Sequence, residues 1–303
     1  MHTKKIGEKL FLIDLETGGF KNLIASYVLK GTKITIVETG PSSSIPNLLS
    51  GLKELNINAE DVAYVAISHV HIDHGGGAGT LVKFLPNAKV IVHPRGAPHL
   101  VNPEKLWLES QKVLGHVAKI YGAPEPVPEE RIIIATDGML FDVGNGVELK
   151  AIETLGHASH HLSYYESLNE GIFLGDSAGI YLSKFDVVVP TAPPPFRLDT
   201  ALASLEKLVR FEPKALYYSH FGKTLNAAKR LQNYALQIKL WAKIIEEAIK
   251  DKQSPEAIRE RILTEDKAMR KIASFLRSHP VFMKTMLENS VQGFVDFAGK
   301  PKL

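Results

Sequence analysis

The sequence predicts an α/β (α+β) domain over residues 1–222 and a helical C-terminal region over residues 223–303. Three observations support this prediction. Short apolar runs bounded by Gly or polar residues dominate the first two-thirds of the chain, which is typical of β-strands. After Gly222 the apolar residues recur at helical spacing and the strand pattern is lost. The length of 303 residues fits one large domain with an appendage, because domains average about 150 residues.

The individual elements follow from local patterns. Strands are predicted at Lys9–Asp14, Leu23–Leu29, Lys33–Val37, Val62–Ile67, Lys89–Val92, Arg131–Ala135, Val147–Ile152, Leu162–Tyr165, Gly171–Leu174 and Ala215–Tyr218. Helices are predicted at Ile45–Leu55, Gly77–Leu85, Asn102–Tyr121, Asp199–Arg210, Leu225–Lys250 and Pro255–Leu276. Two proline-rich segments, Ala123–Glu130 and Pro190–Pro195, are predicted to be connectors.

The composition is that of an ordinary globular protein, with 45% hydrophobic and 23% charged residues. No apolar run approaches the ~18 residues of a membrane span, so we expect a cytoplasmic protein with no membrane partner. The absence of cysteine excludes disulfides, thiolate metal sites and thiol nucleophiles. Residues 1–220 contain 20 Lys/Arg and 24 Asp/Glu, whereas residues 221–303 contain 16 and 9. This basic tail indicates either an anionic partner or simply the charged outer faces of helices.

The strongest signal is the segment His69-Val70-His71-Ile72-Asp73-His74, written H-x-H-x-D-H. It follows the predicted strand Val62–Ile67. Alternate residues of an extended chain share a face, so His69 and His71 can reach one point in space. Asp73 and His74 lie in the following turn and can face a second point nearby. A chance cluster of surface histidines is the alternative interpretation, and this density of ligands makes it the weaker one.

Three more residues with metal-binding side chains each follow a predicted strand. His157 follows a Gly turn, Asp176 follows Leu174-Gly175, and His220 follows Ser219. Loops at the ends of strands in a rigid sheet can converge on one site. The sequence therefore predicts a site built from nitrogen and oxygen ligands.

The order H-x-H-x-D-H, Gly-His, Gly-Asp, His, over about residues 8–222, resembles the metallo-β-lactamase superfamily. The resemblance implies a four-layer αββα sandwich as the catalytic domain, with a dinuclear metal site at one edge. Carried over by position, the first metal would be held by His69, His71 and His157, the second by Asp73, His74 and His220, and Asp176 would bridge the two.

Imidazole and carboxylate ligands favour zinc, iron or manganese over copper(I), and we expect two divalent ions, with Zn²⁺ the first choice and Fe or Mn as alternatives. Two metals can activate a shared water and polarise a carbonyl or phosphoryl oxygen. Asp73 is also a candidate catalytic residue, as a base or orienter of the nucleophile. Glu38, in Glu38-Thr39-Gly40, stands where the superfamily commonly shows Asp; it would hydrogen-bond a ligand histidine or cap the next turn.

Two other motifs are weaker. Gly175-Asp176-Ser177-Ala178-Gly179 matches the serine-hydrolase pattern G-x-S-x-G, with Asp199 and His220 in suitable order. That interpretation requires a helix directly after the strand, and the following residues look extended. The glycine-rich run 75–79 favours tight packing behind the metal loop over phosphate binding. The positions of His160 and His161 allow a substrate contact or a structural role.

The resemblance favours a dinuclear hydrolase of a thioester, ester or lactone, acting through a metal-bridging hydroxide. Size and C-terminal helices are similar to glyoxalase II, while Phe221 and Leu155 depart from its usual Tyr and Pro; lactonases share the same ligands. True β-lactamases of the fold lack the bridging aspartate. A mononuclear iron persulfide dioxygenase, held at His69, His157 and Asp176, is the main alternative, and a nuclease-type phosphodiesterase is a weaker one. We expect a small-molecule substrate and no nucleic-acid partner; homodimer formation is left open.

Overall fold

The computed structural model describes residues 2–279 and 286–299, and the chain divides into two compact units. Unit 1 comprises residues 1–153, 160–175 and 214–225, and unit 2 comprises residues 154–159, 176–213 and 226–303. The predicted domain boundary after residue 222 stays a prediction. Residues 1, 280–285 and 300–303 of the two predicted domains lie outside the described residues.

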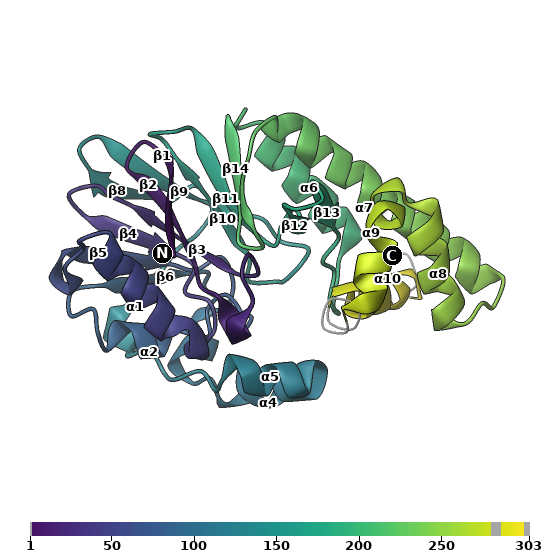
Figure 1. Cartoon of the computed structure of the whole chain (residues 1–303), viewed down its shortest axis with the longest axis horizontal. Helices are drawn as coiled ribbons and strands as arrows, with labels where there is room; N and C mark the ends of the chain where they lie inside the picture. The colour runs from purple at the N-terminus through teal and green to yellow at the C-terminus, as the bar shows by residue number, and fades with distance from the viewer. Residues whose placement is uncertain (1, 280–285, 300–303) are drawn as a thin grey trace. The chain divides into compact units, whose positions relative to one another are not determined.

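The first sheet of unit 1 has seven strands in sequence order (Figure 1). They are β1 (Thr3–Gly7), β2 (Leu10–Asp14), β3 (Ala25–Leu29), β4 (Ile34–Val37), β5 (Val62–Ala66), β6 (Lys89–Val92) and β7 (Ile132–Ile134). The first four strands are antiparallel, and β4 to β7 are parallel. The carboxyl ends of β4, β5 and β6 therefore lie at one edge, and Glu38, the H-x-H-x-D-H segment and His93 follow them there.

The second sheet of unit 1 has six strands in the order β15-β14-β11-β10-β9-β8. These are β8 (Leu140–Gly144), β9 (Val147–Glu153), β10 (Leu162–Glu166), β11 (Gly171–Gly175), β14 (Ala215–Tyr218) and β15 (Gly222–Thr224). Strand β10 is antiparallel to β9 and β11, and β11 is parallel to β14. Strands β9, β11 and β14 thus run in one direction, and His157, Asp176 and His220 follow their carboxyl ends in the sequence.

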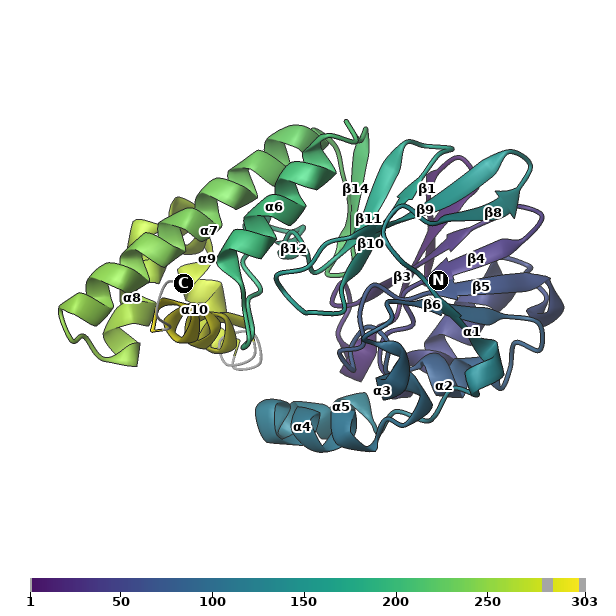
Figure 2. The same ribbon diagram turned by 180° about the vertical axis from the view of Figure 1, so that it is seen from behind.

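The two sheets face each other across one hydrophobic core (Figures 1 and 2). Alternate residues of each strand point into it, and Tyr27 lies with its ring centroid 5.2 Å from Phe173 and 5.8 Å from Tyr217. Such aromatic pairs add about 0.5–1.5 kcal/mol each beyond area burial. The Tyr164 hydroxyl donates to the Ile67 carbonyl at 2.8 Å, which fixes the start of the H-x-H-x-D-H loop against the second sheet.

In the sequence, the helices of unit 1 come between successive strands of the first sheet. They are α1 (Ile45–Glu54), α2 (Ala78–Val82), α3 (Ala97–Val101), α4 (Glu104–Leu114) and α5 (His116–Tyr121). The single helix predicted to end at Tyr121 is wrong, because Gly115 has a φ of 55°, outside the helical region, and separates α4 from α5. Helix α4 has no buried residue, so Trp107 and Leu114 are not part of the core, whereas Tyr121 in α5 is buried.

Unit 2 combines a β-hairpin with five helices among the described residues. Its elements are β12 (Ile180–Leu182), β13 (Val187–Val189), α6 (Leu198–Val209), α7 (Ala227–Lys250), α8 (Pro255–Glu265), α9 (Lys267–Ser278) and α10 (Asn289–Ala298). The predicted helix Pro255–Leu276 is interrupted at Asp266, which is extended (φ −79°, ψ 118°) and caps α9. Within the described residues, no helix has the length and apolar character that crossing a membrane requires.

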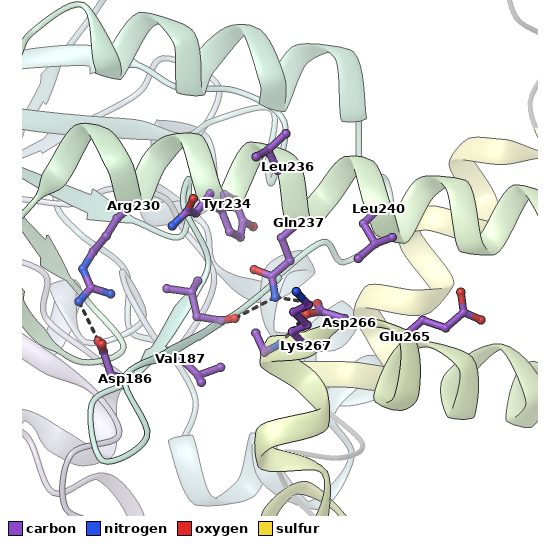
Figure 3. A pocket seen from close by; sticks show the side chains of 13 residues that line it. Asp186, Val187, Arg230, Tyr234, Leu236, Gln237, Leu240, Glu265, Asp266 and Lys267 are labelled. Atoms are coloured by element: carbon purple, nitrogen blue, oxygen red, sulfur yellow. Dashed lines mark hydrogen bonds and ion pairs between the residues drawn. The ribbon is translucent and has the colours of Figure 1, made fainter.

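Asp266 connects α7 with the start of α9 in unit 2. One carboxylate oxygen accepts the backbone N–H of Ala268 at 2.8 Å, and the other accepts Gln237 Nε2 and Trp241 Nε1, both at 2.8 Å. Figure 3 shows Gln237 and Asp266 lining a pocket of about 540 Å³ beside α7. Because Trp241 is fully buried, its N–H depends on this carboxylate.

Candidate metal centre

The H-x-H-x-D-H segment of unit 1 forms a tight turn after β5. The backbone N–H groups of His74 and Gly75 both donate to the carbonyl of His71, at 2.9 and 3.0 Å. A Cβ atom at Gly76 would lie 2.2 Å from the carbonyl oxygen of Ile72. The glycines after the motif therefore serve close backbone packing, as predicted, since a side chain at Gly76 would collide with the loop.

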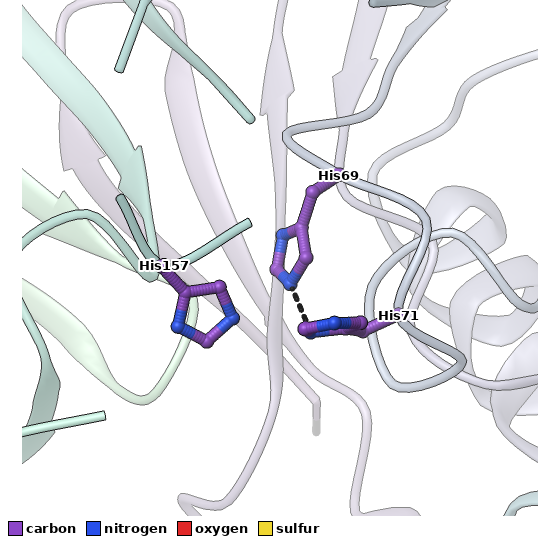
Figure 4. A group of neighbouring side chains, drawn as sticks. All are labelled: His69, His71 and His157. Atoms are coloured by element: carbon purple, nitrogen blue, oxygen red, sulfur yellow. Dashed lines mark hydrogen bonds between the residues drawn. The ribbon is translucent and has the colours of Figure 1, made fainter. Parts of the chain in front are cut away.

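His69 and His71 present ring nitrogens to one point. His69 Nε2 lies 2.8 Å from His71 Nδ1, the contact drawn as a dashed line in Figure 4. His69 is fully buried, and its other ring nitrogen, Nδ1, lies 2.9 Å from the hydroxyl oxygen of Ser68. The two imidazoles therefore lie together, although residues 67–71 follow β5 as irregular chain and not as part of the strand.

Asp73, His74 and His220 form a second group in the same unit. The Nε2 atoms of His74 and His220 lie 3.2 Å apart, and Asp73 Oδ2 lies 4.0 and 3.6 Å from them. Metal–nitrogen bonds of about 2.0–2.1 Å at a tetrahedral angle place two ligand nitrogens roughly 3.3 Å apart. The group could therefore hold a metal ion without large side-chain movement.

The remote ring nitrogens of these histidines face acceptors. His220 Nδ1 donates to the carbonyl of Leu23 at 2.8 Å, and His74 Nδ1 lies 3.3 Å from Glu38 Oε2. A proton on Nδ1 leaves the Nε2 lone pair available for a metal. The surroundings of the second group thus favour the tautomer that ligation needs.

Glu38 occupies an unusual backbone position. It is buried, has a φ of 69°, and its Oε1 accepts the backbone N–H of Ser68 at 3.2 Å. The turn Ser42–Ser44 and helix α1 receive no side-chain cap. Of the two roles considered for Glu38, the structure therefore supports contact with a ligand histidine.

In unit 2, His157 and Asp176 lie close together. His157 Nε2 is 3.6 Å from Asp176 Oδ2, both side chains are buried, and His157 Nδ1 donates to the carbonyl of Thr191 at 3.1 Å. Gly156 precedes His157 with a φ of 132°, and a Cβ there would lie 2.5 Å from the Cα of Ala201 in α6. The glycine thus lets the loop pass against α6 and directs the His157 ring.

Three other residues with reactive side chains do not belong to these ligand groups. Ser177 is followed by the strand β12 and not by a helix, so the serine-hydrolase elbow is absent at this position. Asp199 is exposed in the first turn of α6. His93 is buried, lies 2.9 Å from Glu153 and accepts a backbone N–H on its other nitrogen, which is a structural arrangement.

Comparison with known proteins identifies relatives of this chain. The family model described as the metallo-beta-lactamase superfamily matches residues 21–220. The chain is 33% identical over 208 residues to ST1585, a metallo-beta-lactamase fold-containing protein of Sulfurisphaera tokodaii. The aligned region covers 67% of this chain and 74% of that protein.

Solved structures show the same fold. The crystal structure of archaeal ST1585 superposes with a TM-score of 0.69 at 23% identity, covering 96% of this chain and 99% of that one. TTHA1429 from Thermus thermophilus gives a TM-score of 0.64 at 20% identity, covering 90% and 87%. The predicted α+β sandwich with a helical C-terminal region is confirmed.

Proposed function

Because the chain belongs to the metallo-β-lactamase superfamily, whose members are generally hydrolytic enzymes, we propose that it is a metal-dependent hydrolase of a thioester, ester or lactone. The observation that carries this proposal is the group Asp73, His74 and His220. Its two ligand nitrogens lie 3.2 Å apart, and the second ring nitrogen of each histidine faces an oxygen acceptor. This arrangement matches the requirements of a bound divalent ion.

We propose two ions in the working enzyme. Besides the group of Asp73, His74 and His220, the order of the ligand residues along the chain supports a second ion on His69, His71 and His157, with Asp176 shared between the two ions. All are nitrogen and oxygen donors, because the chain has no cysteine. This donor set suits Zn²⁺ first, and Fe or Mn as alternatives.

The bound metals would supply an activated water and a Lewis acid for the substrate carbonyl. The protein's own contribution is to fix the ligands and to manage the proton of the nucleophile. Asp73 is only partly buried, with 24% of its side chain exposed, and is the carboxylate of its group in unit 1. We assign Asp73 both metal ligation and orientation of the nucleophile, for which it can accept a hydrogen bond.

Metal analysis of the purified protein, paired with hydrolysis assays, tests the proposal. We expect two equivalents of a divalent metal and turnover of thioesters, esters or lactones that chelators abolish and added metal restores. One equivalent of iron with oxygen uptake on a persulfide would instead identify a dioxygenase. Chelator-resistant hydrolysis inhibited by a serine reagent would contradict the metal mechanism.

Replacement of Asp176 tests the bridging assignment. Asp176→Ala should abolish turnover and lower the metal content, with a cooperative unfolding transition retained. Asp142→Ala is the matched control, because Asp142 is an exposed aspartate on β8 whose ion pair is with Lys33. Unchanged turnover in Asp176→Ala would refute the assignment.

A further inference from the structure

Strand β13 of unit 2 turns one of its two edges towards α7. In the hairpin of β12 and β13, Leu182 pairs with Val187, and Tyr181 pairs with Val188. Successive pairs of an antiparallel ladder alternate between exchanging hydrogen bonds and pointing their N–H and C=O groups outward. The carbonyl of Val188 accepts a hydrogen bond from Gln237 Nε2 of α7 at 3.2 Å, which identifies the second pair as an outward-pointing one. The N–H of Val188 therefore points to the same side as its carbonyl.

The pocket of about 540 Å³ on this side adds an acceptor to that donor. Gln237 Nε2 donates to the Val188 carbonyl at 3.2 Å and to Asp266 Oδ2 at 2.8 Å, so the orientation of the amide is fixed. No described residue donates a hydrogen bond to Gln237 Oε1, and Figure 3 shows this oxygen on the side of the amide away from Asp266. One N–H and one carbonyl oxygen are thus offered together, which is the complement of a peptide group.

The size and the apolar wall of the pocket suit an extended chain. The lining follows α7 from Arg230 to Leu240, which is about 15 Å at 1.5 Å per residue, or the length of about four extended residues. Leu240 is half-buried, and Leu236 is 64% exposed, so both side chains present apolar surface there. The volume lies within the range of roughly 300–1,000 Å³ that is typical of ligand pockets.

The charges of the lining favour an acidic ligand. Arg230 is paired with Asp186 at 2.7 Å, and Glu265 has a partner within α8 at 2.6 Å. The carboxylate of Asp266 accepts hydrogen bonds from four N–H groups, two of them at the start of α9. Lys267 is exposed and has no ion pair with any described residue, so its charge is the one that a ligand carboxylate can meet.

We propose that this pocket binds a short extended peptide, which adds a strand to β13 and carries aliphatic side chains and one acidic side chain. Hydrogen bonds from the peptide main chain to Val188 and Gln237 hold it, and contacts with Leu236, Leu240 and Lys267 select its sequence. None of the candidate metal ligands lines the pocket, so the proposal stands independently of the hydrolase function.

Nuclear magnetic resonance of the full chain, with nitrogen-labelled valine, tests the main-chain contacts. The probe is the peptide acetyl-Val-Leu-Val-Glu-amide. We expect the Val188 amide proton to exchange with solvent without protection in the free protein, and its resonance to shift on titration with a Kd on the order of 1 mM. The same peptide methylated on its two central amide nitrogens cannot donate these hydrogen bonds. It should bind about threefold to tenfold more weakly, the size of one missing hydrogen bond.

Charge reversal at Lys267 tests the choice of ligand. Lys267→Glu should weaken binding of the acidic peptide and strengthen binding of acetyl-Val-Leu-Val-Lys-amide, each by about twofold to fivefold, as expected for an exposed ion pair. Lys239→Glu is the matched control, because Lys239 is exposed on α7 and does not line the pocket. An unshifted Val188 resonance at several millimolar peptide, equal binding of the methylated peptide, or the same response in both Glu variants would overturn the proposal.

Discussion

Replacing Glu38 by Gln tests how the protein fixes its second group of ligands. Glu38 Oε1 accepts the backbone N–H of Ser68 at 3.2 Å, and Glu38 Oε2 lies 3.3 Å from His74 Nδ1, a distance that suits an ion pair. A glutamine has one acceptor oxygen and one NH₂ group at the same place, so it can satisfy only one of these donors. In either orientation of the amide, its NH₂ group faces one of the two donors, so that one N–H group lies against another.

The size of the effect depends on which of the two donors is left without an acceptor. Residues that orient a metal-binding histidine commonly change metal affinity by ten- to a hundredfold, or about 1.4–2.8 kcal/mol. If the amide instead turns its NH₂ group towards Ser68, the buried backbone N–H there has no acceptor, at a cost of about 1–3 kcal/mol of folding stability. We therefore expect weaker metal binding, lower folding stability, or a smaller loss of each.

Competition with a chromophoric chelator measures the two metal-binding steps separately. In Glu38→Gln, the step assigned to Asp73, His74 and His220 should weaken, while the other step changes less. Glu60→Gln is the control, because Glu60 is exposed. If Glu38→Gln binds metal and unfolds like the wild type, the contact between Glu38 and His74 has no orienting role.

Two further predictions concern stability. Asp266→Ala removes the cap of α9 and strands the buried N–H of Trp241, so the free energy of unfolding should fall by about 2–5 kcal/mol in denaturant titrations, and a loss within error would contradict this. Burial raises the pKa of Glu166, so the folded protein holds that proton to higher pH than the unfolded chain, and stability should decline as pH rises through this range. Glu166→Gln should remove that part of the decline; parallel pH profiles of the unfolding free energy would refute the assignment.

The sequence predicts the central strands of the two large sheets well and most of their edge strands poorly. Each predicted strand overlaps an observed one, because buried β-branched and aromatic residues recur in short runs. The strands it did not predict in the two large sheets, β1, β8 and β15, all lie at sheet edges. Edge strands face water along one side and carry more polar residues, as Lys4 and Lys5 illustrate in β1.

The site shows a similar division. The candidate ligands could be named because their side chains carry the chemistry. Their supports could not, since two of them are backbone carbonyls, of Leu23 and Thr191, which any residue type could provide. Ser68 is a side-chain contact, but only the fold brings its hydroxyl to His69. Spacing alone left the direction of the Glu38 side chain undetermined.

The distance in sequence between His74 and His220, 146 residues, has a consequence for synthesis. A ribosome-bound chain contains the first of these ligands long before the second is made, and β14, which leads to His220, pairs with β11, a strand that is made earlier. The group can therefore hold an ion only late in folding. Metal would then stabilise finished molecules selectively, because a ligand that binds only the native state shifts the folding equilibrium towards it. Cellular metal supply would in this way set how much of the newly made protein persists.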